Sequence, residues 1–168
     1  MLASETLIQE LGKILGMPLE LDKKTRRCVL RDKASKKEYF IELPQHAPYL
    51  YLYCVLLKAS VEQQSEHFYR ALLEMNLFGL KTDMGVLSID PISRSILLHL
   101  SFPTEFLTPQ LLCNLLTNFL AMALKVAAAV EDQLLISNKD ARKRQSHYSA
   151  ADGMDRDDPK RSMRVIRI

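Results

Sequence analysis

The chain has 168 residues, of which 48% are hydrophobic and 26% charged, a composition typical of a globular protein with one real core. The net charge of +3 is unevenly spread: residues 138–168 hold nine Lys/Arg and five Asp, a net of +4, whereas residues 1–137 hold 14 basic and 15 acidic side chains, a net of −1. We find no run of about 18 apolar residues that predicts a membrane span, and no basic segment ahead of an apolar run at the N-terminus, so we expect a cytoplasmic protein without a signal peptide.

The first predicted element is an amphipathic helix over residues 4–15. Leu7, Leu11 and Ile14 follow the i, i+4, i+7 spacing of one helix face, and polar residues lie opposite. Gly16 followed by a Met-Pro pair predicts the end of this helix.

Three strands are predicted next, over residues 28–30, 38–43 and 49–55. The charged turn at 33–37 makes the first two a hairpin, and prolines bracket the turn before the third. Strand alternation places three tyrosines of the third strand on one face, namely Tyr49, Tyr51 and Tyr53.

A second helix is predicted over residues 60–76, because Ser60 and Gln63 have the spacing of a capping box. Its main apolar arc includes Phe68 and Leu72. A further apolar shoulder lies outside this arc and consists of Tyr69, Leu73 and Leu77. A helix that packs on one sheet needs only one apolar stripe, so the shoulder indicates a second surface, such as a partner subunit.

Two more strands are predicted over residues 84–90 and 93–102, followed by a last helix with Thr108 at its N-cap and Pro109 at its first position. This helix is apolar almost all round up to about Ser137, so we expect it to be buried on every side. The order α-β-β-β-α-β-β-α with hairpin-length connections predicts an α+β fold, a twisted and mostly antiparallel sheet packed with helices.

The segment after Ser137 loses the helical pattern and becomes charged. Because it has few large apolar groups with which to offset its ordering entropy, we expect residues 138–168 to be a disordered tail, and residues 1–137 to be the folded domain.

The sequence predicts no catalytic, cofactor-binding or metal site. The four histidines have no metal-ligand spacing, no Cys pair reads C-x-x-C, and no phosphate-binding glycine loop or nucleophile motif is present. The three cysteines lie far apart in apolar segments, as expected of small buried side chains in a reducing compartment.

The second half of the chain resembles a known family. Residues 71–79 read ALLEMNLFG and continue as LKTDMGVLSIDPISRSILLHLSF. This stretch is similar to that of the Tir chaperone family, the class I type III secretion chaperones, which has a leucine pair, an Asn, an apolar pair and a Gly, then a Gly turn into a strand. The matching residues are Leu72, Leu73, Asn76, Leu77, Phe78, Gly79, Thr82, Gly85, Leu87, Asp90 and Pro91.

The resemblance implies a non-enzymatic homodimer that needs no cofactor or ATP. Such a chaperone binds the N-terminal segment of secreted effector proteins in the bacterial cytoplasm, keeps it export-competent and delivers it to the secretion machinery, where the export ATPase is an expected partner. The candidate cargo-binding residues are Leu7, Leu11, Ile14, Tyr49, Tyr51 and Tyr53, and the candidate dimer-interface residues are Phe68, Leu72, Leu73 and Leu77. A sheet edge is a further acceptor for an extended cargo strand.

Two alternatives stay open at this point. The apolar candidates, in particular Leu7, Leu11, Ile14, Phe68 and Leu72, are equally consistent with plain core positions. The rival function is a nucleic-acid-binding protein or a regulatory adaptor that uses the basic residues at 23–37 and the basic tail. The basic hairpin lacks aromatic partners and the tail is interrupted by Asp, so we expect no nucleic-acid partner.

Overall fold

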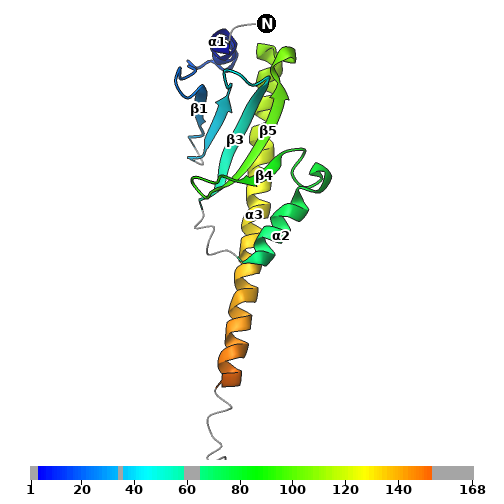
Figure 1. Ribbon diagram of the computed structural model, residues 1–168. Helices are drawn as coiled ribbons and strands as arrows, with labels where there is room; N and C mark the ends of the chain where they lie inside the picture. Colours follow the sequence, from blue (N-terminus) through cyan, green and yellow to red (C-terminus); the bar gives the residue numbers. More distant parts are fainter. Residues whose placement is uncertain (1–3, 34–35, 59–64, 153–168) are drawn as a thin grey trace, which may run out of the picture.

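The computed structural model describes residues 4–33, 36–58 and 65–152 (Figure 1). The elements in chain order are α1 (Ser4–Leu15), β1 (Arg27–Arg31), β2 (Glu38–Glu42), β3 (Tyr49–Leu57), α2 (Glu66–Met75), the 3₁₀ helix η2 (Leu77–Gly79), β4 (Val86–Ile89), β5 (Ile96–Pro103), the 3₁₀ helix η3 (Thr104–Phe106) and α3 (Pro109–Asp152). The predicted α+β class and the predicted order of helices and strands are confirmed, with η2 and η3 as additions.

The five strands form one antiparallel sheet in the order β1-β2-β3-β5-β4. Hairpins join β1 to β2, β2 to β3 and β4 to β5, as the short connections predict. The link through α2 is longer, and it allows β5 to pair with β3 while β4 becomes an edge strand. Helix α3 runs along one face of the sheet, α1 lies at its upper end in the view of Figure 1, and α2 lies beside β4.

The core lies between the sheet and α3. Alternate residues of a strand point to the same side, so each strand contributes one apolar face. The buried strand residues are Cys28, Tyr39, Ile41, Leu50, Leu52, Cys54, Leu87, Ile96 and Leu98. From α3, Leu112, Leu116 and Phe119 pack against them, and the ring of Phe119 meets that of Tyr39 edge-on, with centroids 6.4 Å apart.

Helix α1 packs on α3 and is stopped where the sequence predicts. Gly12 permits a close return of the chain, since a Cβ there would lie 2.6 Å from the carbonyl oxygen of Met17. Gly16 adopts a φ of +67°, which glycine tolerates without steric cost and which ends the helix. The helix therefore packs one apolar face into the core and is followed directly by a tight turn.

Helix α2 begins later than predicted. Its first residue is Glu66, and Ser65 is the N-cap, with an extended backbone and a side chain that accepts a hydrogen bond from the backbone N–H of Phe68. The predicted capping pair, Ser60 and Gln63, lies outside the described residues. The prediction of a continuous helix from Ser60 is wrong at Ser65, because its extended backbone interrupts any helix there.

Helix α3 does not end near Ser137, as predicted, but continues to Asp152. Residues 138–152 contain no Gly or Pro, and many of them are good helix formers such as Ala, Lys, Arg and Gln. Extending an existing helix needs no new nucleus, so even a polar segment continues it. The expectation that residues 138–152 lack helical structure is therefore wrong, and residues 153–168 lie outside the described chain.

The apolar circumference of α3 is not buried on every side, contrary to the prediction. Leu124, Leu135 and Ile136 are exposed, while one stripe faces the sheet, α1 and α2. By length and composition, residues Pro109–Lys139 also qualify as a candidate membrane-crossing helix, which corrects the expectation of no such stretch. The expectation was based on an uninterrupted run of apolar residues. Residues Pro109–Lys139 contain some polar residues, but their mean hydropathy is still high enough. The buried stripe of α3 is what a core helix of a globular protein shows.

Candidate functional site

The sheet face turned away from α3, here called the open sheet face, carries a row of side chains that crosses all five strands. From β1 to β3 the row consists of Val29, Phe40 and Tyr53, which are direct cross-strand partners. It continues through His99 on β5 to Val86 on β4. The two valines at the ends are 50% and 44% exposed, so the row starts and finishes at the surface.

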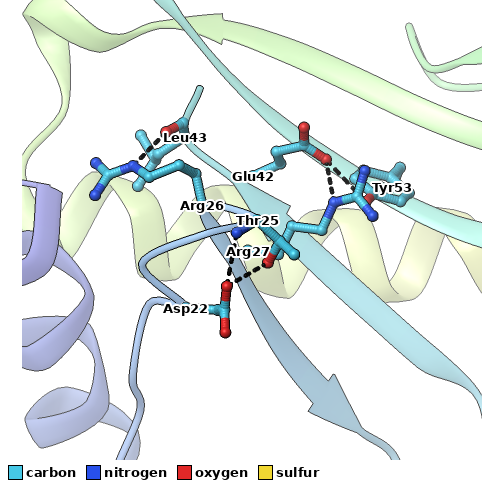
Figure 2. A network of polar contacts seen from close by, with 7 residues as sticks. All are labelled: Asp22, Thr25, Arg26, Arg27, Glu42, Leu43 and Tyr53. Atoms are coloured by element: carbon cyan, nitrogen blue, oxygen red, sulfur yellow. Dashed lines mark hydrogen bonds and ion pairs between the residues drawn. The ribbon is translucent and has the colours of Figure 1, made fainter. Parts of the chain in front are cut away.

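An aromatic stack orders the middle of this row, together with a polar network that Figure 2 shows. The rings of Phe40 and Tyr53 stack with centroids 4.9 Å apart and planes 10° from parallel. The Tyr53 hydroxyl donates to Oε2 of Glu42 at 2.9 Å, and Nε of Arg27 donates to the same oxygen at 2.7 Å. Burial and the hydrogen bond to Glu42 raise the pKa of Tyr53, and burial lowers the pKa of His99, so both side chains are uncharged at neutral pH.

These side chains border a shallow groove of about 430 Å³ on the open sheet face. Its lining consists of Arg27, Phe40, Glu42, Tyr51, Tyr53, Val55, Asp90, Ser93, Leu97 and His99. The aromatic and aliphatic groups supply apolar contact area, and the charged groups beside them supply hydrogen-bonding partners. An extended peptide, whose side chains alternate in direction, matches such a surface.

A second groove of about 610 Å³ lies where the start of α1 meets the turn before β3 and the turn after β5. Its lining consists of Ser4, Leu7, Leu43, Pro44, Gln45, His46, Ala47, Pro48, Tyr49, Pro103, Thr104, Glu105 and Leu107. The backbone N–H of Thr104 donates to the carbonyl oxygen of Pro48 at 2.9 Å and holds the two turns together. Tyr49 and Tyr51 lie on the same face of β3, so this upper groove adjoins the open sheet face.

The structure separates the predicted cargo-binding residues into two groups. Tyr49 is 42% exposed, and Tyr51 and Tyr53 are half-buried, all on the open sheet face. Leu7 and Leu11 are 5% and 0% exposed, because the face of α1 that carries them packs into the core. Leu11 is therefore unable to contact cargo in this conformation, and Leu7 only borders the upper groove. Ile14 is 45% exposed, but it lines neither groove.

A third surface, here called the α2 face, is formed by the outer side of α2, the η2 turn and the following loop. Its most exposed large apolar residues are Leu73 at 71%, Leu77 at 59%, Phe78 at 80%, Leu80 at 77% and Met84 at 71%. Phe78 also has a φ of +53°, a left-handed conformation that costs a bulky residue about 1–3 kcal/mol. Beside this surface lies an apolar pocket of about 250 Å³ between α2 and β4.

The predicted dimer-interface residues also fall into two groups. Leu73 and Leu77 lie on the α2 face, as the apolar shoulder predicts. Phe68 and Leu72 are 0% and 6% exposed and belong to the core, because they form the arc that faces α3 and the sheet. Sequence reasoning did not single out Phe78 and Leu80 as surface residues. The available signal was a cluster of large apolar side chains around Gly79, in a turn and not in a regular element.

The three arginines of the 23–37 segment are each paired with a glutamate. The guanidinium group of Arg26 pairs with Glu5 at 2.5 Å, Arg27 pairs with Glu42, and Arg31 pairs with Glu38. These pairs neutralise charge that a phosphate backbone would otherwise contact. Among the described residues, no group of three or more His, Cys, Asp or Glu side chains is placed to hold a metal ion.

Comparison with solved structures identifies the fold. The chain resembles a protein in the HopA1-SchA chaperone-effector complex, with 20% identity, a TM-score of 0.58 and coverage of 76% of this chain and 91% of the other. It resembles a protein in the ExsC-ExsE complex equally well, with 18% identity, a TM-score of 0.58 and coverage of 77% and 92%. A third likeness is to a chain in the complex of the Yersinia pestis type III secretion chaperone SycH with a fragment of YscM2, with 15% identity, a TM-score of 0.52 and coverage of 73% and 98%.

The sequence itself identifies the family. No curated protein sequence matches the chain, but the profile of the Tir chaperone protein (CesT) family matches residues 6–127. The chain belongs to this family. It is therefore a type III secretion chaperone, and the matched region extends from α1 into the part of α3 that packs on the sheet.

Proposed function

We propose that this chaperone binds the N-terminal segment of one or more effector proteins in the bacterial cytoplasm, keeps it extended and export-competent, and delivers it to the secretion machinery without ATP and without catalysis. Its expected partners are the effectors and components of the export apparatus such as its ATPase. The observation that carries the proposal is the open sheet face, which in a chain of this family offers aromatic contact area next to a sheet edge, β1, that has no outer strand among the described residues.

We propose that cargo occupies the open sheet face and the adjoining upper groove, with Tyr49, Tyr51 and Tyr53 as contact residues. Tyrosine suits this role because it offers a large rigid apolar area at low entropic cost and keeps a polar tip. The β1 edge adds a backbone acceptor. Within the described chain, the stretch Val29–Arg31 has no strand on its outer side, so it is free to accept an extended segment.

We further propose that two copies of the chain associate through the α2 face. Its five exposed apolar side chains come from α2, η2 and the following loop, whereas exposed apolar residues of a monomeric protein are usually scattered singly. A stable homodimer buries roughly 800 Å² per subunit.

The test begins with copurification and mass spectrometry to identify an effector. Its N-terminal segment is then titrated against the wild-type chain, Tyr51→Asp and, as a matched control, Leu135→Asp on the exposed side of α3, in the absence of ATP. We expect tight binding for the wild type and the control and a large loss for Tyr51→Asp. Equal affinities for all three, with each chain folded by circular dichroism, would remove the open sheet face as the cargo site.

A further inference from the structure

Strand β4 is an edge strand, and a side chain occupies the outward backbone groups of its residue Leu87. The side-chain amide of Asn76 donates from Nδ2 to the carbonyl oxygen of Leu87 at 3.0 Å. The backbone N–H of Leu87 donates to Oδ1 of the same side chain at 2.8 Å. A neighbouring antiparallel strand makes this same pair of hydrogen bonds with one residue.

The position of Leu87 in β4 determines whether its backbone N–H and carbonyl groups point outward or toward β5. In an antiparallel ladder, alternate residues direct both backbone groups toward the same neighbour. Because Asn76 takes both groups of Leu87, these are the outward ones, and the groups of Val86 and Ser88 point to β5. Of the four residues of β4, Leu87 and Ile89 therefore have outward backbone groups, and Asn76 occupies those of Leu87.

The backbone around Asn76 holds the amide in place. Asn76 is the C-cap of α2, and its backbone N–H donates to the carbonyl oxygen of Leu73 at 3.1 Å. Its own carbonyl oxygen accepts the N–H of Gly79 at 3.1 Å. Both the end of α2 and the η2 turn therefore fix the side chain against β4, at the border of the α2 face.

The opposite edge of the sheet, strand β1, has no side chain that occupies its outward groups in this way among the hydrogen bonds of the described residues. On β1 the carbonyl oxygen of Arg27 accepts the N–H of Asp22, and the rest of the strand has no outer strand partner among the described residues. An exposed strand edge is a template for another chain. Among the described residues, the sheet therefore has one open edge, far from the α2 face, and one edge next to that face that is occupied at Leu87.

We propose that Asn76 is a specificity-determining residue that closes the β4 edge, so that copies of this chain meet through the side chains of the α2 face in a closed dimer and do not pair β4 edge to edge. The inference rests on the proposed dimer for its biological meaning, but the closed edge is a property of each subunit. Without the amide, the exposed leucines and phenylalanine beside β4 bring a second chain close to an open strand. Edge pairing then adds to side-chain packing, and association no longer stops at two subunits.

The test is Asn76→Ser. The serine side chain is too short to make the two hydrogen bonds to Leu87, and it adds no apolar surface. We expect amide hydrogen exchange at Leu87 to accelerate at least tenfold, and light scattering to show masses above the dimer that increase with concentration. Gln110→Ser is the matched control, because Gln110 has a side-chain amide that donates to Asn114 at 3.2 Å on the exposed side of α3. This control is expected to keep the wild-type mass and the wild-type exchange at Leu87.

A second variant, Asn76→Asp, keeps the proposal testable if Asn76→Ser does not fold. Asn76→Asp keeps the acceptor for the Leu87 N–H and loses the donor to its carbonyl oxygen, so exchange at Leu87 stays slow while association increases less than in Asn76→Ser. Unchanged exchange at Leu87 in Asn76→Ser overturns the proposal, and so does fast exchange with an unchanged mass. If the wild-type chain is a monomer, the proposed dimer fails by itself, and growth of Asn76→Ser beyond the wild-type mass still decides the role of Asn76.

Discussion

The open sheet face and the α2 face are both apolar, but they are built in opposite ways. On the open sheet face the aromatic rings are half-buried against each other and tied to charged groups, as in the contact of Tyr53 with Glu42 and Arg27. On the α2 face, leucines and a phenylalanine project with 59–80% of their surface exposed. The first surface is stable in water when empty, which suits a partner that binds and leaves. The second is the surface that we propose as the dimer interface.

The largest effect that this comparison predicts concerns the α2 face. Leu73→Asp places a charge where the proposed interface buries an apolar side chain, so dimerisation weakens at least 100-fold, about 3 kcal/mol. Light scattering then shows the subunit mass of 19.2 kDa at micromolar concentration. Leu135→Asp, at a leucine of α3 that is 57% exposed, keeps the wild-type mass. A dimeric Leu73→Asp would place the dimer interface elsewhere.

A smaller effect is expected on the open sheet face. Tyr51→Asp lowers the affinity for an effector segment about 10–100-fold, because the charge replaces aromatic contact area. Calorimetric titration measures this loss, and the same sample remains a dimer by light scattering. If Tyr51→Asp dissociates the dimer, the open sheet face and the α2 face do not have separate roles in cargo binding and dimerisation.

The pH dependence of stability sharpens the comparison further, because the open sheet face contains His99, which is half-buried, whereas none of the residues named for the α2 face is a histidine. Burial lowers the pKa of His99 in the folded chain, so the unfolded chain takes up a proton more readily. The stability linked to His99 is complete above the ordinary histidine pKa of about 6.5 and is lost as the pH falls through the lowered value. Urea midpoints at pH 7.5, 6.0 and 5.0 are expected to fall less steeply for His99→Gln than for the wild type. Parallel curves would show that His99 does not contribute.

The smallest effect is expected from truncation. The described residues that line the two grooves or form the α2 face all precede Thr108, so we expect deletion of residues 138–168 to leave the fold and the dimer intact and to change effector affinity less than about threefold. Circular dichroism, light scattering and the same titration test this expectation. A truncated chain that folds but loses cargo would move recognition to the basic segment.

The sequence by itself determined the order of elements, the strand faces and the family. Helix periodicity and the Gly16 stop placed α1, alternation put the three tyrosines of β3 on one face, and the motif around Asn76 carried the resemblance that the family match confirmed. These features depend on local chemistry and on spacings of two or 3.6 residues, which a linear sequence displays directly.

Only the tertiary structure decided which apolar residues remain accessible. Leu11 and Leu73 both occupy apolar positions on amphipathic helices, yet one is fully buried and the other is 71% exposed. The difference depends on which elements pack against each helix, and no local pattern reports it. The same holds for Asn76, whose role exists because the η2 turn brings it against Leu87, eleven residues later in the chain. The end of α3 was also mispredicted, because a helix held by its packed half continues through residues that would not begin one.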